Sequence, residues 1–332
     1  MSKEKKILFY CTTPFINVGS YRIWVHDLNN YFKQAGIQSE IANPNSRVED
    51  HDIIICGKED AEAASKIKTK YPERTVGVIN LSAEKKNLNI DFVIVGSLEE
   101  MDSLSTYENV FLFPLIENMF QNCKQKEHIE KDVLRIGYHG HYPHLSKFEP
   151  HLKSALEYID KICDIELLVV TTHENINWQY GRPNIKNIAI KKWGLDTIKQ
   201  NLMTCDVGIV PNVTYIDMKN HNFPINDHYG MHSTDHVIRM KNKSNAGRSF
   251  VFHQLGIPIV TDLTPSNFHI LGDPRCGTIA FNKQSWIKGI LKYKDPKVRT
   301  KVAKNAKEEF DRLYNPISWA ERLYFNIRSI KK

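Results

Sequence analysis

Short apolar runs that alternate with amphipathic stretches are the feature that most limits the folds open to this chain. A stretch with helical period runs from about Ser20 to Ala35 and ends before Gly36, a residue that commonly terminates helices. Strands that are apolar on both faces are typical of parallel sheets covered by helices on both sides. The pattern therefore predicts an α/β fold with a doubly wound sheet. The apolar runs of the first part are Lys6–Cys11, Ser39–Ala42, Asp52–Cys56, Thr75–Ile79, Asp91–Val95 and Val110–Pro114.

The same pattern starts again after a polar, charged segment, Gln121–Asp132, which we interpret as an interdomain linker. With 332 residues, and about 150 residues for an ordinary domain, two domains are expected. We predict two Rossmann-like domains facing a cleft, residues 1–125 and 126–310, and a C-terminal helix, 311–332, that packs back on the first domain. The second set of strands is Leu134–Tyr138, Ile165–Thr171, Asp206–Pro211 and Pro258–Thr261, and its helices are Glu149–Lys161, Leu195–Met203, Lys243–Leu255 and a tail over 296–330.

The composition of the chain favours a cytoplasmic protein with anionic partners. No apolar run is long enough to span a membrane, and the N-terminus reads as a first strand rather than a signal peptide. The six cysteines form no C-x-x-C pair, which favours reduced thiols in a cytoplasmic protein. The net charge of +7 favours anionic partners, but no nucleic-acid-binding motif is present.

The loop after the first strand, Thr12–Ser20, is the first candidate binding element. Gly19 and Ser20 open a helix there, and free N–H groups at a helix start suit an anion or a sugar hydroxyl. A single glycine does not make the dinucleotide pattern G-x-G-x-x-G. The alternative is an ordinary helix start that Ser20 caps.

A histidine-rich turn, Gly137–His141 with His144 beyond it, follows the first strand of the second half. Gly140 lets the backbone approach a ligand, and the imidazole of His139 or His144 can donate to a phosphate or a sugar oxygen. The alternative is a tight turn with surface histidines.

Two further strands of the second half end in polar residues, Thr171 and Asn212, and strand ends in this position shape the nucleotide pocket of such sheets. Trp193 is a candidate to frame a base, although a core tryptophan is the commoner outcome.

The most informative segment is Lys241–Ser249, which runs into an apolar helix. Lys243, Ser244, Asn245 and Arg248 cluster at its start, where the helix dipole favours anions rather than cations. Exposed N–H groups together with lysine and arginine describe a pyrophosphate site. A solvated charged face is the alternative, and it fits less well because all the charges are positive.

Three histidines, His228, His232 and His236, are spaced by four residues, which makes a metal site conceivable. Pro224 nearby favours a loop over the cleft instead. On that interpretation Arg239, at the far side of the loop, can reach a phosphate.

Taken together, these motifs resemble the GT-B glycosyltransferases, particularly the short bacterial, family 4-like enzymes that build capsule and O-antigen. Lys243–Val260 is similar to the family pattern K-S-N/D-x-K…G-x-P-V, Ile136–Gly140 with His144 to its Y-H-G…H turn, and Asp206–Pro211 to a further strand.

The resemblance implies a nucleotide-diphosphate sugar held by the C-terminal domain, no cofactor and no catalytic metal. It places Lys243 and Arg248 against the diphosphate, His139 and Gly140 in the same pocket, and Gly19 with Ser20 across the cleft.

One departure concerns the acidic pair Glu-x7-Glu of many retaining members, whose two positions are Lys243 and Val251 here. The usual carboxylate contacts to the sugar and ribose are therefore absent, and the stereochemical outcome is open. An inverting enzyme needs a general base in the first half, where His26 and Asp27 are titratable.

The sequence thus predicts a metal-independent, retaining hexosyltransferase of bacterial surface polysaccharide synthesis, with a glycan or lipid-linked acceptor. The alternatives are a sugar-nucleotide epimerase on the same fold, a non-catalytic partner subunit, and a two-domain binding protein. The tail Ile317–Lys332 is amphipathic, so it either packs on the first domain or makes a peripheral contact with the inner face of the membrane.

Overall fold

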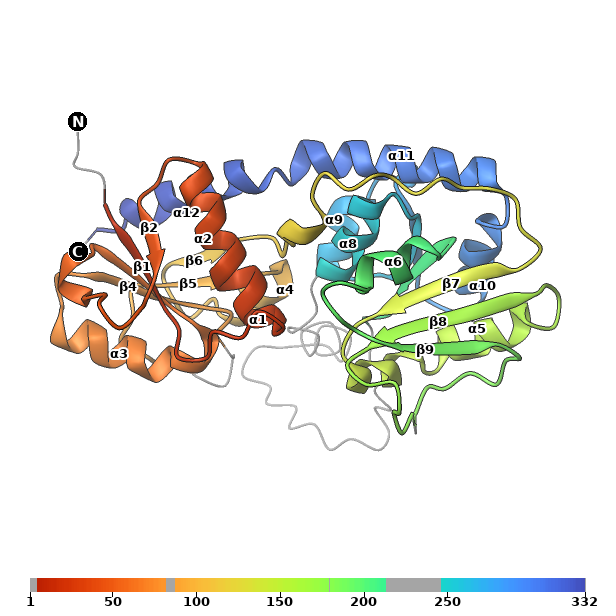
Figure 1. Ribbon diagram of the computed structural model, residues 1–332, viewed down its shortest axis with the longest axis horizontal. Helices are drawn as coiled ribbons and strands as arrows, with labels where there is room; N and C mark the ends of the chain where they lie inside the picture. Colours follow the sequence, from red (N-terminus) through yellow and green to blue (C-terminus); the bar gives the residue numbers. More distant parts are fainter. Residues whose placement is uncertain (1–4, 82–86, 179, 213–245, 332) are drawn as a thin grey trace, which may run out of the picture. The chain divides into compact units, whose positions relative to one another are not determined.

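The computed structural model describes residues 5–81, 87–178, 180–212 and 246–331. The chain forms two compact units (Figure 1), one of residues 1–119 and 314–332 and the other of residues 120–313. The divisions fall at 119/120 and 313/314, a few residues from the boundaries expected at 125/126 and 310/311.

Unit 1 is built on a parallel sheet with the strand order β2-β1-β3-β4-β5-β6. Each strand coincides with an apolar run of the sequence, because strands in the middle of such a sheet are buried on both faces. All the strands expected in the first part of the chain are therefore present. They are β1 Ile7–Tyr10, β2 Ser39–Ile41, β3 Ile53–Cys56, β4 Thr75–Ile79, β5 Phe92–Val95 and β6 Val110–Leu112.

The first helical stretch of unit 1 has three consecutive parts, α1 Gly19–Tyr21, a π-helix Arg22–Asp27 and α2 Leu28–Gln34. It ends as expected at Gly36, whose φ of 76° is left-handed. Ser20 lies within the first turn, and Val18 occupies the N-cap position without a side-chain bond. The interpretation of Ser20 as a cap is therefore wrong. The other α-helices of this unit are α3 Ala61–Lys70, α4 Leu98–Ser103 and α12 Pro316–Arg328.

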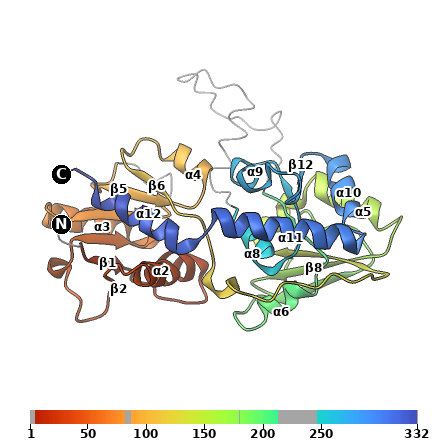
Figure 2. The same ribbon diagram turned by 90° about the horizontal axis from the view of Figure 1, so that it is seen from above.

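The C-terminal helix α12 packs into unit 1, as expected, and lies against α2 (Figures 1 and 2). Its apolar side chains Ala320, Leu323 and Ile327 are buried in the core of that unit. The hydroxyl of Tyr324 accepts from the Lys5 amide at 2.9 Å and lies 3.1 Å from the Lys5 carbonyl oxygen. The apolar face of the tail is thus used inside the protein.

Unit 2 is built on a second parallel sheet, ordered β12-β11-β10-β7-β8-β9. The first strand of this unit, β7, lies between the second and the fourth, so the order reverses between β7 and β10. Ligands of open α/β sheets bind at such a reversal, outside the carboxyl ends of the strands. The strands are β7 Leu134–His139, β8 Ile165–Thr171, β9 Ile188–Lys192, β10 Val207–Val210, β11 Ile259–Asp262 and β12 Thr278–Ala280.

One helix expectation in the second half lies partly outside the described residues, and another needs correction. Of the helix expected over Lys243–Leu255, residues 243–245 are outside the described part, and the described helix starts at Gly247 with Ala246 as its N-cap. The helix expected over 296–330 is two helices, since the Asn315 side chain caps a new start by accepting from the amides of Ile317 and Ser318. The α-helices of unit 2 are α5 His151–Ile159, α6 Ile198–Met203, α8 Gly247–Leu255, α9 Pro265–Leu271, α10 Lys283–Lys292 and α11 Pro296–Leu313.

The segment interpreted as a linker has no strand or α-helix, but it is fastened to unit 2. The Gln125 side chain donates to the Gln254 carbonyl at 3.0 Å, and the His128 ring lies 2.9 Å from the Gly256 carbonyl. Burial lowers the pKa of His128 to about 4, so this ring is neutral at pH 7 and donates to that carbonyl. These bonds hold the segment against the end of α8.

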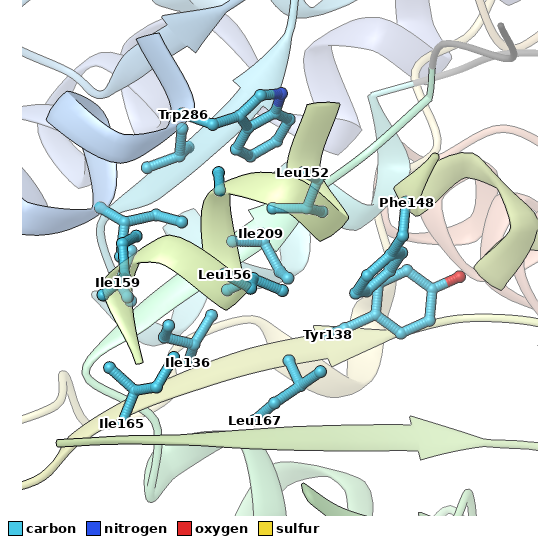
Figure 3. Packing of buried hydrophobic residues seen from close by; sticks show 14 of the residues in the cluster. Ile136, Tyr138, Phe148, Leu152, Leu156, Ile159, Ile165, Leu167, Ile209 and Trp286 are labelled. Atoms are coloured by element: carbon cyan, nitrogen blue, oxygen red, sulfur yellow. The ribbon is translucent and has the colours of Figure 1, made fainter. Parts of the chain in front are cut away.

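The main core of unit 2 lies between the sheet and helices α5 and α10 (Figure 3). Leu152 and Leu156 of α5 pack onto Ile136 of β7, and Trp286 comes from α10. The ring of Tyr138 lies at the margin of this cluster beside Phe148. The core therefore fixes β7 firmly up to the residues at its carboxyl end.

No helix in the described part of the chain is long and apolar enough to cross a membrane. All six cysteines are free thiols.

Candidate functional site

Arg248, the second residue of α8, spans the point where the strand order of unit 2 reverses. Its Nη2 donates to the Pro211 carbonyl at 3.0 Å and to the Asn212 side-chain oxygen, both just after β10. Its guanidinium also lies 5.5 Å from the ring centre of Tyr138, on β7. One side chain thus joins the carboxyl ends of the two strands that flank the reversal.

Three buried groups around this arginine donate to no acceptor within the described structure, although the Tyr138 oxygen faces the Arg248 guanidinium, which offers donors only. They are Nη1 of Arg248, the hydroxyl of Tyr138 and Nδ2 of Asn212. Burial raises the pKa of Tyr138, so its hydroxyl stays protonated and can donate. A buried polar atom left without a partner costs about 1–3 kcal/mol. Three such donors in one place describe a site for an anionic oxygen.

Gly140 closes this group on the side of β7. Its φ is 147°, and a Cβ atom there would lie 2.9 Å from the Tyr138 hydroxyl and 3.3 Å from Cδ of Arg248. The Gly140 carbonyl accepts from the Thr171 hydroxyl at 2.7 Å, which ties the turn to the end of β8. Only glycine suits this backbone conformation and this close approach.

His139 supports the site rather than facing a ligand with its donor nitrogen. Its Nε2 lies 3.3 Å from the Arg248 carbonyl, and its ring contacts Phe252 edge-on. Burial, with the nearby Arg248 charge, lowers the pKa of His139 to about 4. The neutral ring therefore donates from Nε2 to the helix, so this N–H is already used and is not free to donate to a phosphate.

A network of buried polar groups holds Asn212 in place. Its backbone N–H donates to the carboxylate of Asp262, at the end of β11, at 2.6 Å. Nearby, Asn267 of α9 donates to Thr261 at 2.5 Å and accepts from Ser249 of α8 at 2.9 Å. The ends of β10 and β11 and the starts of α8 and α9 are thus bonded to one another, which fixes the guanidinium of Arg248.

His144 lies in the 3-10 helix Tyr142–Phe148 that follows the turn, and its ring packs 5.9 Å from that of His141. Partial burial and the positive charges of Lys147 and Arg248 lower the pKa of His144. The ring is surface-exposed, so it can meet a ligand at this edge of the sheet.

The remaining predicted site residues lie elsewhere in unit 2, in unit 1 or outside the described residues. Gly19 and Ser20 belong to unit 1. Trp193 is half-buried, and its amide donates to the Thr171 carbonyl at 2.6 Å. Outside the described residues lie Arg239, Lys243, Ser244 and Asn245, and also His228, His232 and His236.

The pair considered as a general base lies in the π-helix of unit 1. Nδ1 of His26 is 3.0 Å from Oδ1 of Asp27, whose other oxygen accepts from the Asn118 amide at 3.0 Å. Burial raises the pKa of Asp27. The pair thus consists of a half-exposed imidazole beside a buried carboxylate.

Sequence reasoning included Tyr138 in the histidine-rich turn but gave its side chain no role in the site. An aromatic residue in a buried strand is typical of core packing, and its ring does pack in the core. The available signal was its place at the strand end, directly before His139 and Gly140.

Among the described residues, no group of three His, Cys, Asp or Glu side chains could hold a metal ion.

The sequence matches no known protein family and no curated protein. Solved structures, in contrast, are similar over nearly the whole chain. A glycosyltransferase from Rickettsia africae superposes with a TM-score of 0.63 at 11% identity, covering 99% of this chain and 100% of its own. Sucrose-phosphate synthase from Thermosynechococcus elongatus gives 0.62 at 10% identity, covering 98% of each chain. HepE of Anabaena, solved in complex with UDP, gives 0.59 at 10% identity, covering 98% of this chain and 100% of its own.

The fold is that of the GT-B glycosyltransferases. This confirms the expected fold class of two Rossmann-like α/β units. The GT-B fold also gives the site its setting, because Arg248, Tyr138 and Gly140 meet at the strand reversal of one such unit.

Proposed function

We propose that this protein is a glycosyltransferase that takes a sugar from a nucleotide-diphosphate donor bound at the carboxyl edge of unit 2. The observation that carries the proposal is the set of three buried donors without acceptors, Arg248 Nη1, Tyr138 Oη and Asn212 Nδ2. The GT-B fold over nearly the whole chain supports it.

The chemistry of these groups favours a phosphate oxygen. All three can donate, and one carries a permanent charge, so a neutral hydroxyl ligand would leave that charge unbalanced. Charge builds up on the diphosphate as the sugar bond breaks, and donors fixed in advance stabilise it without reorganising. Arg248, held on two strands, is such a donor.

The donor base to test first is uracil, because a neighbour of the same fold was solved with UDP. We propose that basic side chains replace a metal ion at the diphosphate and that transfer retains the anomeric configuration, as in the enzymes that the sequence resembles. The proposed acceptor is a glycan or a lipid-linked sugar of bacterial surface polysaccharide synthesis, in the cytoplasm. Contact with the inner face of the membrane would need a surface other than the buried face of α12.

Thermal shift and calorimetry with UDP-, GDP-, dTDP- and CMP-sugars, with and without EDTA, test the proposal. At least one nucleotide-diphosphate sugar is expected to bind, and Arg248→Ala to weaken it about tenfold or more, since a hydrogen bond to a charged group contributes about 1.5–3 kcal/mol. Arg275→Ala is the matched control, because that arginine is an exposed residue of the same unit that pairs with Asp273.

Failure of every nucleotide to bind would refute the proposal. Binding with conversion of the donor sugar to its epimer, and no transfer to water or to an acceptor, would assign the chain to the epimerases instead. Binding with no turnover of any kind would favour the non-catalytic partner subunit.

A further inference from the structure

A cavity of about 640 Å³ lies in unit 1, away from the carboxyl edge of its sheet. It opens beside β2, the edge strand of the sheet, at the amino ends of β1 and β2. Its walls are the end of α2 at Lys33, the turn Gly36–Gln38 and the segment that returns from β2 to β3. Ligand pockets typically measure about 300–1,000 Å³, so the cavity is large enough for a sugar unit.

The lining of this cavity combines apolar surface with side chains that carry both donors and acceptors. Ile7 and Ile37 are its only apolar side chains, and it has no Phe, Tyr or Trp ring on which a nucleobase could stack. Amides and hydroxyls that can pair with sugar hydroxyls come from Gln38, Ser39, Asn43, Asn45 and Ser46. This lining fits a carbohydrate better than an apolar ligand or a nucleoside.

The charges around the cavity favour an acidic carbohydrate. Among the described residues, the side chains of Lys6, Lys33 and Arg47 have no ion-pair partner. The lining also holds two carboxylates, those of Glu40 and Asp50, so its three cationic side chains exceed its carboxylates by one. The Glu40 carboxylate is already engaged, accepting from the Ser46 hydroxyl at 2.8 Å and lying 3.3 Å from Nε2 of His51. Positive charge therefore remains for one anionic group of a ligand.

The wall that carries Arg47 is held in place before any ligand arrives. Asn43 and Ser46 bond to each other twice, amide to hydroxyl at 3.2 Å and amide to carbonyl at 2.9 Å. Further along, the Glu49 carbonyl accepts from Arg74 at 2.8 Å, and the Glu49 carboxylate accepts from the Tyr71 hydroxyl. Because the wall is ordered in advance, a ligand loses less entropy on binding.

We propose that this cavity binds an acidic sugar, one that carries a carboxylate or a phosphate, at a site separate from the donor site of unit 2. Lys33 and Arg47 meet the anionic group, and the amides of Gln38 and Asn45 meet the hydroxyls. On a glycosyltransferase such a site holds a unit of an acidic glycan remote from the reacting end.

The test measures dissociation constants of the full chain by NMR titration for glucuronate, glucose 6-phosphate, glucose and inorganic phosphate. At least one of the two acidic sugars is expected to bind five times more tightly than both glucose and phosphate. The double variant Lys33→Ala, Arg47→Ala is expected to lose that binding about tenfold, from two exposed charge contacts with hydrogen bonds. Lys66→Ala, an exposed lysine of α3 outside the cavity, is the matched control and is expected to bind as the unaltered protein does.

Two results would overturn the inference, namely acidic sugars that bind no better than glucose or phosphate, or binding that survives in the double variant. Donor binding is measured on the same samples. If nucleotide-sugar affinity is unchanged in the double variant, the two sites are independent. If the unaltered protein binds no nucleotide at all, that result refutes the proposed function alone.

Discussion

The substitution Tyr138→Phe separates the two roles that a buried hydroxyl can have. The ring packs against Phe148 and stays in place, while the hydroxyl proton has no acceptor within the described structure, where the Arg248 guanidinium lies beside it. Without a ligand, its removal is expected to raise the free energy of unfolding of unit 2 by about 1 kcal/mol, at the low end of the cost of an unpaired buried group. With a nucleotide-diphosphate ligand, the same change is expected to weaken binding about tenfold.

Tyr293→Phe provides the matched control. This tyrosine is equally buried in unit 2, but its hydroxyl lies 3.1 Å from the Thr278 hydroxyl and donates to the Ile259 carbonyl at 3.4 Å. Its loss is expected to lower stability by about 1 kcal/mol and to leave nucleotide affinity unchanged. The two variants thus shift stability in opposite directions.

Urea unfolding of the ligand-free variants, followed by tryptophan fluorescence, measures the first effect, and calorimetry with a nucleotide sugar the second. A change of 1 kcal/mol corresponds to a shift of about 0.3–1 M in the urea midpoint, since the unfolding free energy falls by about 1–3 kcal/mol per molar urea. A Tyr138→Phe protein that is less stable without ligand would show that the hydroxyl has a structural partner. The proposed anion site at Arg248 would then have two donors instead of three.

Three further outcomes follow from the structure. Gly140→Ala is expected to lower stability by about 1–3 kcal/mol, because alanine is strained at this positive φ. It is also expected to lower donor affinity, because the new Cβ meets Tyr138 and Arg248. Unchanged affinity in calorimetry would contradict the placement of this turn. His253 is fully buried with both ring nitrogens unpaired within the described structure, and burial lowers its pKa to about 3. Since the unfolded chain takes up a proton near pH 6.5 and the folded one does not, stability is lost as the pH falls below that value, by about 2 kcal/mol between pH 7 and 5 from this ring. His253→Phe should flatten the measured pH dependence by that amount, and an unchanged slope would show that the ring is protonated or exposed. Leu323→Ala in α12 is expected to destabilise unit 1 by about 3 kcal/mol in denaturant unfolding, and a loss below 1 kcal/mol would mean that α12 is not part of that core.

Most of the strands that sequence reasoning identified are buried on both faces, because burial leaves a continuous apolar run; the exceptions are the half-buried edge strands β2 and β6. It missed β9 and β12 for the converse reason. β9 ends in two exposed lysines, Lys191 and Lys192, and β12 has only three residues. Both are edge strands, which need less apolar surface, so they leave a weaker pattern.

The candidate site was predictable in part. Gly140 and Arg248 stand out from position and charge, and the structure brings them together. The role of Tyr138 depends on which of its atoms lacks a partner, and that of His139 on a bond to a carbonyl 109 residues away. Neither property leaves a local trace in the sequence.

The return of α12 to unit 1 sets the order in which the protein can fold during synthesis. Residues 1–119 emerge first from the ribosome, but the hydrophobic core of that unit also contains Leu323 and Ile327. All of unit 2 is translated in between, so it can complete its core while the first unit still lacks a helix. The N-terminal part of unit 1 therefore stays incompletely folded, with apolar surface exposed, until α12 has been synthesised.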